Sequence, residues 1–309
     1  MAMAAQVYSQ DQLTRYLEHI SYPRSQHPRD ELQFLKELQA HHLARVPFES
    51  ISLHYSPHRT LSVDADDLFQ KVVEKSRGGY CVEMNTIFGD MMRALGFNVL
   101  SIGARVKPGP VYLGMQVLTH SANIVTINQQ RYLVDVAFGS HGAFTPVPLI
   151  NGFEFDNILP RRGKLEFRPL AQSTSPSTQS LWVYSTQDLP STDWTERYCF
   201  TETELFRADY EVMNFYCSTV RTAVFVNNVF ALRGIINDRG DGLKGVLTLL
   251  RNEVRRRVEG APGLEVVETL ANEEDRVKAL EKWFEIPLNK REATAIRGLP
   301  TELVSPRHL

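Results

Sequence analysis

The first third of the chain is patterned for helices. Apolar residues recur at three- and four-residue spacing over residues 10–20, 30–43 and 64–75, which is the period of an amphipathic helix. A fourth apolar stripe follows Cys81 and ends at Leu95, where Gly96 supplies a C-cap. This stripe predicts a helix whose first turn holds Cys81, behind a loop hinged by two glycines.

The pattern changes after Gly96. Residues 98–106, 122–127 and 131–138 are rich in β-branched side chains and partly alternate between apolar and polar, as strands do. Three further runs also favour strands, at residues 165–170, 181–185 and 224–236. The segment 171–180 is rich in Ser, Thr, Pro and Gln and predicts an exposed loop.

Helical periodicity returns towards the C-terminus. Residues 243–258 and 273–284 both fit the helical period, and Asn272 is an N-cap candidate for the second. No internal repeat is visible in the sequence. Helices first, a β-rich middle and a mixed tail together predict an α+β protein of three modules.

Composition narrows the range of partners. The 309 residues include 34 basic and 36 acidic side chains, for a net charge of -2, which gives no electrostatic footprint for nucleic acid or an anionic membrane. The basic run at residues 255–257 is predicted to be a solvated helix face. No stretch approaches the ~18 apolar residues of a membrane span, and no signal-peptide core is visible. We therefore expect a cytoplasmic protein.

Three cysteines, an odd number, favour free thiols over a disulfide framework. No CxxC pair, HExxH motif or His/Cys cluster suggests a metal, and neither common nucleotide-binding glycine motif is present. We expect no bound metal. Cys199 and Cys217 are interpreted as small buried hydrophobes, the usual state of a lone intracellular cysteine.

Cys81 has a different context. It follows Gly78, Gly79 and Tyr80, begins a helix and lies near Arg77, and these features favour a thiolate. A cysteine nucleophile also needs a base, usually histidine, and the histidine needs an acceptor that orients it. The alternative, a buried structural thiol, stays open on these features alone.

His120 and Asp135 are the partners that the sequence suggests. His120 opens one predicted strand, and Asp135 lies inside the next, where a carboxylate is costly unless something pairs it. His141 is the reserve. A hairpin turn at residues 129–130 would leave His120 and Asp135 roughly 13 Å apart along the strand. A turn near residues 127–128, or a bulge, would bring them together, and the sequence leaves the register open.

Four stretches of the sequence resemble one known family. RGGYCVEMN resembles the R-G-G-x-C-x-E-x-N signature of the arylamine N-acetyltransferases, and VPFESISLH resembles their P-F-E-N-L element. TH followed by YLVDVAFG resembles the family's His and Asp segments, and DRVKALEKWFEIPL its C-terminal helix. The resemblance spans essentially the whole chain. Two positions depart from the pattern, Ser50 in place of Asn and Arg221 where Pro is common.

This resemblance implies a fold and a site. The fold would be a helical bundle at residues 1–95, a β-barrel at 96–215 and an α/β lid at 216–309, with a papain-like Cys-His-Asp arrangement. Cys81 would be the nucleophile, His120 its base and proton carrier, and Asp135 the residue that orients His120. Backbone N–H groups at the helix start would stabilise the oxyanion.

The resemblance also implies a reaction. An acyl group, acetyl by default, would pass from acetyl-CoA or another acyl-CoA to Cys81 and then to an arylamine, a hydrazine or an N-hydroxyarylamine, in a ping-pong cycle. The alternatives are a thiol hydrolase with the same triad, a malonyl-CoA-selective transferase and a binding module without catalysis. Expected partners are therefore small aromatic amines and coenzyme A.

Seven further residues are candidate contacts for these substrates. The amine would contact Phe138, Tyr80 and Thr119, and coenzyme A would contact Gly139, Tyr216, Thr222 and Arg221. The guanidinium of Arg221 fits three interpretations: a contact to a coenzyme A phosphate, a contact to a malonyl carboxylate, or a solvated surface charge.

Overall fold

The N-terminal region is helical, as expected. The structure, a computed structural model, describes residues 7–107, 117–175, 177, 179–261 and 263–304. The first helices are α1 (Gln10–His19), η1 (Arg24–Gln26), α2 (Glu31–Arg45), α3 (Ile51–His54), α4 (Ala65–Phe69), η2 (Gln70–Glu74) and α5 (Cys81–Ala94). Side chains of Ser9, Asp30 and Asp64 cap α1, α2 and α4 by accepting backbone hydrogen bonds, which satisfies part of each helix start.

Helix α5 is the centre of this region. Every side chain from Cys81 to Met92 is buried, and the apolar ones join a core that includes residues of α1, α2 and α4. The helix ends at Ala94, and Gly96 follows with φ +96, a conformation that glycine adopts at little cost. The helix predicted from the apolar stripe after Cys81 is therefore confirmed.

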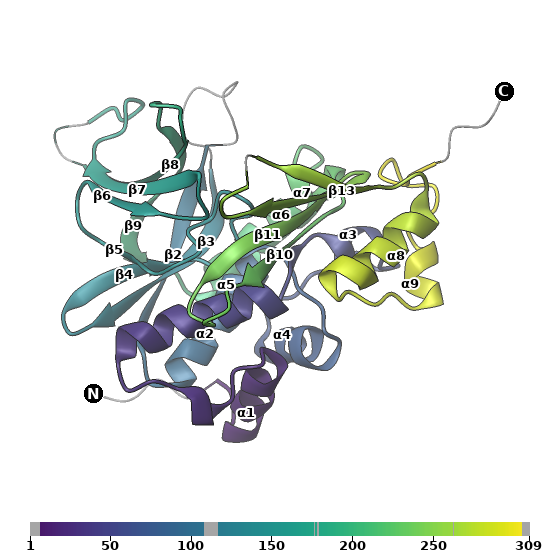
Figure 1. Ribbon diagram of the computed structural model, residues 1–309, viewed down its shortest axis with the longest axis horizontal. Helices are drawn as coiled ribbons and strands as arrows, with labels where there is room; N and C mark the ends of the chain where they lie inside the picture. The colour runs from purple at the N-terminus through teal and green to yellow at the C-terminus, as the bar shows by residue number, and fades with distance from the viewer. Residues whose placement is uncertain (1–6, 108–116, 176, 178, 262, 305–309) are drawn as a thin grey trace.

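The middle of the chain forms one eight-stranded antiparallel sheet. Its strands are β2 (Asn98–Val106), β3 (Leu118–Ile127), β4 (Gln130–Val134), β5 (Val147–Pro148), β6 (Phe153–Asp156), β7 (Arg161–Arg168), β8 (Leu181–Asp188) and β9 (Thr195–Glu204). Their spatial order is β5-β4-β3-β2-β9-β8-β7-β6, and the sheet coils into a barrel-like shape (Figure 1). A core of apolar side chains, among them Ile102, Leu133 and Tyr184, holds it together.

The last third adds a second sheet and its covering helices. The elements are α6 (Arg207–Thr219), α7 (Val224–Asn227), β10 (Phe230–Ile236), β11 (Leu243–Leu250), β12 (Glu253–Val258), β13 (Glu265–Thr269), α8 (Glu273–Phe284) and α9 (Lys290–Thr294). Strand β1 (Phe48–Glu49), from the helical region, pairs with the edge of this sheet through β10. Side chains of β10, β11, β12 and α8 share one apolar cluster. The helix at 273–284 and its cap by Asn272 are confirmed.

Two sequence predictions are wrong in this last third. Residues 243–258 form the hairpin β11–β12 rather than a helix, with a two-residue turn in which Arg251 has φ +59. Short apolar runs fit both periods, and pairing of β11 with β10 selects the strand. The basic run at residues 255–257 therefore lies on a strand. The strand predicted at 224–236 begins only at Phe230, because residues 224–227 form α7.

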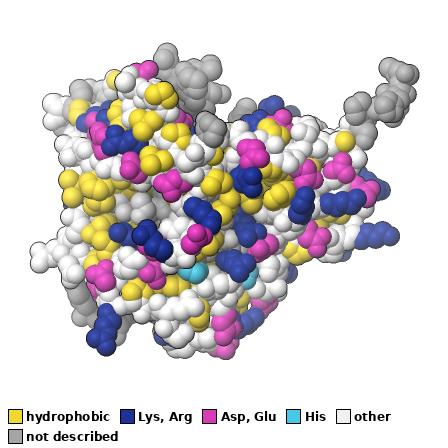
Figure 2. Space-filling view, viewed as in Figure 1, with side chains coloured by type: hydrophobic (Ala, Val, Ile, Leu, Met, Phe, Trp, Pro, Cys, Tyr) yellow, Lys and Arg dark blue, Asp and Glu magenta, His cyan; other side chains and the backbone are white. Residues whose placement is uncertain are grey.

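The observed order of elements confirms the expected α+β class. Helices come first, the barrel-like sheet follows, and a mixed sheet-and-helix region closes the chain (Figure 1). The domain limits at 95/96 and 215/216 stay a prediction, and α6 runs across the second of them. On the face in Figure 2, basic and acidic side chains are interspersed, in line with the near-zero net charge.

Candidate active site

The two positions before Tyr80 and Cys81 must be glycine because other atoms of the protein lie where a Cβ would be. A Cβ on Gly78 would clash with the carbonyl oxygen of Pro47, and a Cβ on Gly79 would clash with the Glu83 carboxylate. The backbone here runs beside β1, where the N–H of Glu49 donates to the Gly79 carbonyl at 2.9 Å. The chain can therefore turn tightly into α5, and this turn delivers Cys81 as the first residue of the helix.

A side chain from the first turn of α5, Glu83, caps the start of that helix. The Glu83 carboxylate accepts a hydrogen bond from the backbone N–H of Tyr80 at 3.2 Å. It also forms an ion pair with Lys71 at 2.6 Å. The first N–H groups of an α-helix have no partner within it, and they carry the positive end of the helix dipole. An anion formed at or beside the Cys81 sulfur would lie at this end.

His120 and Asp135 meet, and the turn between their segments lies one residue from each of the two turns that the sequence left open. Ile127 pairs with Gln130 around a two-residue turn at 128–129, whose residues both have positive φ. The ladder stops at Val134, so Asp135 lies just beyond the strand rather than inside it. The Nε2 of His120 donates to Asp135 Oδ2 at 2.8 Å, and both side chains are at most 2% exposed.

A bulge in β3 lies directly beside His120. Arg105 pairs with Leu118 and Ala104 with His120, which leaves Thr119 as the extra residue. Neighbouring residues of β2 point to opposite faces, so the bulge places Leu118 and His120 on opposite faces as well. The backbone carbonyl of Thr119 accepts a hydrogen bond from the Cys81 thiol at 3.5 Å.

Asp135 is buried but fully bound. Its Oδ1 accepts from Asn85 Nδ2 at 3.0 Å and from the Ala137 N–H at 2.9 Å, while its backbone carbonyl accepts from Gln39 at 3.1 Å. Burial would raise the pKa of Asp135, but the charge and hydrogen bond of His120 outweigh it and lower the pKa. The carboxylate is therefore ionised, as an orienting acceptor must be.

The same ion pair sets the charge on the imidazole and the thiol. Burial alone would lower the pKa of His120, but Asp135 raises it to about 10. Burial raises the pKa of the Cys81 thiol, and the hydrogen bond with His120 opposes that rise. Asp135 thus favours the imidazolium form of His120, and this cation lies where it would stabilise a thiolate at Cys81.

Asn85 is a site residue that the sequence reasoning missed. It lies one helical turn after Cys81, and on α5 that spacing places both on one face. Its amide also accepts from the Val136 N–H at 3.0 Å and donates to the Ser121 carbonyl at 2.7 Å. The signal was present, because Asn85 is the last residue of the motif around Cys81.

Aromatic rings line one side of His120. The Phe138 ring contacts the His120 ring edge-on, with the ring centroids 5.0 Å apart. The ring of Tyr198 on β9 lies 5.1 Å from the His120 ring and 4.7 Å from the Phe138 ring, centroid to centroid. The Tyr198 hydroxyl is buried, and the Asp135 carboxylate beside it helps to raise the pKa of Tyr198. Tyr198 was also missed, because the sequence pattern predicts no strand at β9. The substrate-binding role of Phe138 stays a prediction.

The other candidate contacts lie at differing distances from the site. The Tyr80 hydroxyl donates to the Asn214 carbonyl on α6 at 3.1 Å, and its ring meets Phe225 of α7 edge-on at 5.0 Å. Gly139, with φ +86, lies next to the ring of Phe48. The three remaining candidates for coenzyme A are exposed on the end of α6 and the turn after it: Tyr216, Arg221 and Thr222. Their roles stay predictions.

Two features expected near the site lie elsewhere. His141, the reserve partner, is beside Arg161, Arg197 and Arg257, and burial followed by these charges lowers its pKa to about 3. Arg77 pairs with Glu292 at 3.1 Å and with Glu49 at 4.0 Å. These carboxylates offset the positive charge of Arg77, which was expected to favour a thiolate at Cys81.

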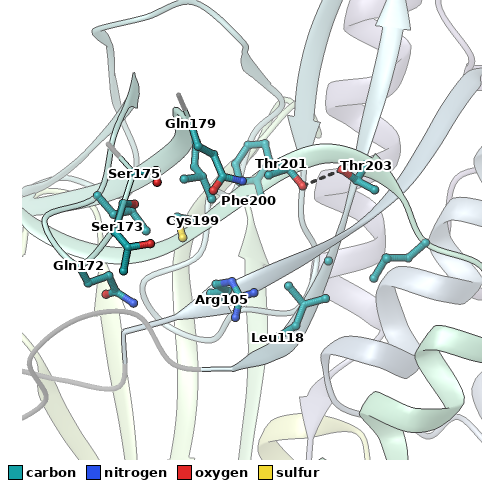
Figure 3. A pocket seen from close by; sticks show the side chains of 15 residues that line it. Arg105, Leu118, Gln172, Ser173, Ser175, Gln179, Cys199, Phe200, Thr201 and Thr203 are labelled. Carbon is teal, nitrogen blue, oxygen red and sulfur yellow. Dashed lines mark hydrogen bonds between the residues drawn. The ribbon is translucent and has the colours of Figure 1, made fainter. Parts of the chain in front are cut away.

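A cavity of ≈ 700 Å³ lies on the outer face of β2, β3 and β9. Figure 3 shows Arg105, Leu118 and Cys199 around it, with polar side chains such as Ser173 and Thr201. Cys81, His120 and Asp135 are not among its lining residues. Within the described ranges, no cluster of three or more His, Cys, Asp or Glu is arranged to hold a metal, and no helix is long and apolar enough to cross a membrane.

Comparisons with known proteins identify the family of this chain. A family model described as N-acetyltransferase matches residues 31–293. An N-malonyltransferase of Fusarium pseudograminearum is 35% identical over 96% of this chain and 93% of its own length. Human arylamine N-acetyltransferase 1 is 26% identical over 89% of this chain and 94% of its own.

Solved structures give the same answer for the fold. The arylamine N-acetyltransferase of Nocardia farcinica is 26% identical with a TM-score of 0.76 and covers 94% of both chains. The Mycobacterium marinum enzyme in complex with CoA, 24% identical, has a TM-score of 0.73 and covers 92% of this chain and 98% of its own. With a family model that spans most of the chain and relatives that align along nearly all of it, this protein belongs to the arylamine N-acetyltransferase family of acyltransferases.

Proposed function

We propose that this protein transfers a short acyl group from acyl-CoA to the nitrogen of an arylamine, a hydrazine or an N-hydroxyarylamine, through a thioester on Cys81. One observation carries the proposal. A thiol at the start of a buried helix interacts with a histidine that a buried carboxylate holds at 2.8 Å. Those are the parts that a cysteine nucleophile requires.

In the first half-reaction the Cys81 thiolate attacks the thioester carbonyl of acyl-CoA. Negative charge moves to the carbonyl oxygen, which the free N–H groups at the start of α5 stabilise. The carbon–sulfur bond to coenzyme A then breaks. His120 gives its Nδ1 proton to the departing thiolate, while Asp135 keeps Nε2 occupied and the ring in place.

In the second half-reaction the amine nitrogen attacks the thioester on Cys81. The neutral imidazole of His120 takes a proton from the nitrogen as the bond to sulfur breaks, which returns the site to its starting state. Ionisation of the thiol adds little by itself. Lowering a thiol pKa from ~8.5 to ~5 raises the thiolate fraction about thirty-fold at pH ~7, and the loss of nucleophilicity is of similar size. Orientation and proton transfer are therefore the main contributions of His120 and Asp135.

One of the two relatives compared above supports malonyl rather than acetyl as the acyl group. Acetyl-CoA is the default that the family name suggests, yet a relative at 35% identity over most of the chain is named for N-malonyl transfer. We propose malonyl-CoA as the preferred donor. Arg221 is a candidate for the malonyl carboxylate because it is exposed in the turn between α6 and α7, four residues before the Phe225 that contacts Tyr80.

One experiment tests the function and the donor together. Purified protein is mixed with malonyl-CoA or acetyl-CoA, with and without an aniline, while free coenzyme A and N-acylaniline are measured. A transferase releases coenzyme A in one burst per site without amine and turns over only with it. Continuous release without amine would make the protein a thiol hydrolase, and no release with either donor would support a binding module.

A further inference from the structure

Cys217 lies in the candidate active site, although the sequence favoured a structural role for it. It is in the last turns of α6, and its thiol donates to the backbone carbonyl of Thr119 at 3.6 Å. The Cys81 thiol donates to that same oxygen at 3.5 Å. Two sulfurs that share one acceptor are no further apart than the sum of these distances, 7.1 Å.

The surrounding contacts hold the two thiols together. Tyr80, directly before Cys81, donates from its hydroxyl to the Asn214 carbonyl at 3.1 Å. Asn214 lies three residues before Cys217, on the same face of α6. Thr119 is the residue of the β3 bulge that has no partner on β2, and its carbonyl receives both thiols. Three segments that are distant in the chain thus converge on one pair of sulfurs.

The reaction mechanism has no use for the second thiol. Burial raises the pKa of Cys217 to about 12, so it stays protonated and does not compete with Cys81 for acyl-CoA. A protonated thiol beside a reactive one still has one characteristic reaction, because a sulfenic acid formed on one cysteine condenses with a neighbouring thiol to a disulfide.

We propose that Cys81 and Cys217 form a reversible disulfide when the protein meets a hydroperoxide. The Cys81 thiolate attacks the peroxide, the oxygen–oxygen bond breaks, and the sulfur is oxidised to a sulfenic acid while the peroxide is reduced to an alcohol or water. Cys217 then attacks the Cys81 sulfur, the sulfur–oxygen bond breaks, and hydroxide leaves with the thiol proton as water. A dithiol reductant reverses the bond by exchange.

The disulfide would protect the acylated residue. A sulfenic acid without a partner proceeds to sulfinic and sulfonic acids, which dithiols do not reduce. Capture by Cys217 stops that sequence at a recoverable state and blocks acyl transfer while it lasts. Cys199 gives a matched control, since it is also buried with a pKa raised to about 11, but it lines the separate cavity in Figure 3.

The test treats reduced full-length protein with hydrogen peroxide, blocks remaining thiols and maps the peptides by mass spectrometry without reduction. The peptides of Cys81 and Cys217 should be linked within one chain, and dithiothreitol should restore both thiols. Cys217→Ser and Cys217→Ala should give no linked peptide and should accumulate sulfinic acid on Cys81. Cys199→Ser should behave as the unaltered chain.

The outcomes are separable from the proposed function because the readout is chemical. A link that includes Cys199, links only between chains, or equal sulfinic acid with and without Cys217 would each overturn the disulfide. Far-ultraviolet circular dichroism of both Cys217 variants checks that they fold. Because serine and alanine differ in polarity, an effect common to both reports the missing sulfur rather than a packing change.

Discussion

Helices α5 and α6 carry the two thiols that meet at Thr119, and their surroundings differ. All side chains of α5 from Cys81 to Met92 are buried. Helix α6 buries Tyr210, Met213, Asn214 and Cys217 on one face, while Val212 and Phe215 on another are 71% and 70% exposed. The proposed chemistry thus lies on the enclosed helix, and proposed coenzyme A contacts lie at the end of the exposed one.

This difference separates two kinds of substitution. A change on α5 disturbs packing or the hydrogen bonds that hold Asp135, so it should remove the reaction or the fold. A change on the outer face of α6 or in the turn after it leaves that network in place and should alter which substrates are used.

Replacing Cys81 by Ala should abolish acyl transfer. By analogy with other nucleophiles, the expected loss in turnover is about 10⁵-fold or more. Mass spectrometry after brief exposure to acyl-CoA without amine should find the acyl adduct on Cys81 in the unaltered chain and no adduct in the variant. An adduct on Cys199 or Cys217 would refute the assignment.

Replacing Asp135 by Asn should reduce turnover by about 10⁴-fold, because the amide stabilises the wrong tautomer of His120. The geometry at 2.8 Å can survive the change, so the loss should appear in both half-reactions with little effect on substrate binding. Pre-steady-state acylation of Cys81 measures the first half directly. Turnover close to that of the unaltered chain would exclude Asp135 as an orienting residue.

A matched pair of truncations compares the two helices in stability. Ile87 on α5 is fully buried, and Ile87→Ala should lower the free energy of unfolding by about 2–5 kcal/mol. Val212 on α6 is 71% exposed, and Val212→Ala should change the free energy of unfolding by less than about 0.5 kcal/mol. Urea unfolding of both variants measures the contrast. Equal losses would mean that the outer face of α6 is covered in solution.

Stability should fall as the pH rises above 6.5. His120 has a pKa of about 10 in the folded protein against about 6.5 when unfolded. Because this pKa is higher in the folded protein, protonated His120 stabilises the fold, and the full contribution is present below pH 6.5. The contribution is lost as the pH rises towards 10. The slope is about 1.4 kcal/mol per pH unit for one proton. Urea unfolding between pH 6.5 and 8.5 should show this slope, and His120→Asn should flatten it.

Replacing Arg221 by Ala should have the smallest effect, and its pattern identifies the role. A carboxylate contact predicts slower acylation of Cys81 by malonyl-CoA alone. A phosphate contact predicts about 1–2 kcal/mol weaker use of both donors, and a solvated arginine predicts no change. Arg239, an exposed arginine in the turn between β10 and β11, gives the control variant Arg239→Ala. Single-turnover acylation across a salt series measures each case.

Much of the fold could be predicted from local patterns. The α5 stripe, the glycines before it, the cap at Gly96 and the helix after Asn272 depend on side chains close in sequence, and all formed as expected. The segment 243–258 failed because its apolar spacing suits a helix and a hairpin alike, and only pairing with β10 separates them. Strand β9 and helix α6 carried no clear signal of their own.

The amino-acid sequence sets which reactive groups are available: a cysteine at a helix start behind two glycines, with a histidine and an aspartate on later segments. The tertiary structure alone decided which of these groups meet. The turn at residues 128–129 and the end of β4 at Val134 brought His120 to Asp135, and packing of α6 brought Cys217 to Cys81. Helix starts and tight turns follow from interactions between neighbouring residues. Register and helix docking depend on summed contacts between distant segments, which no local pattern contains.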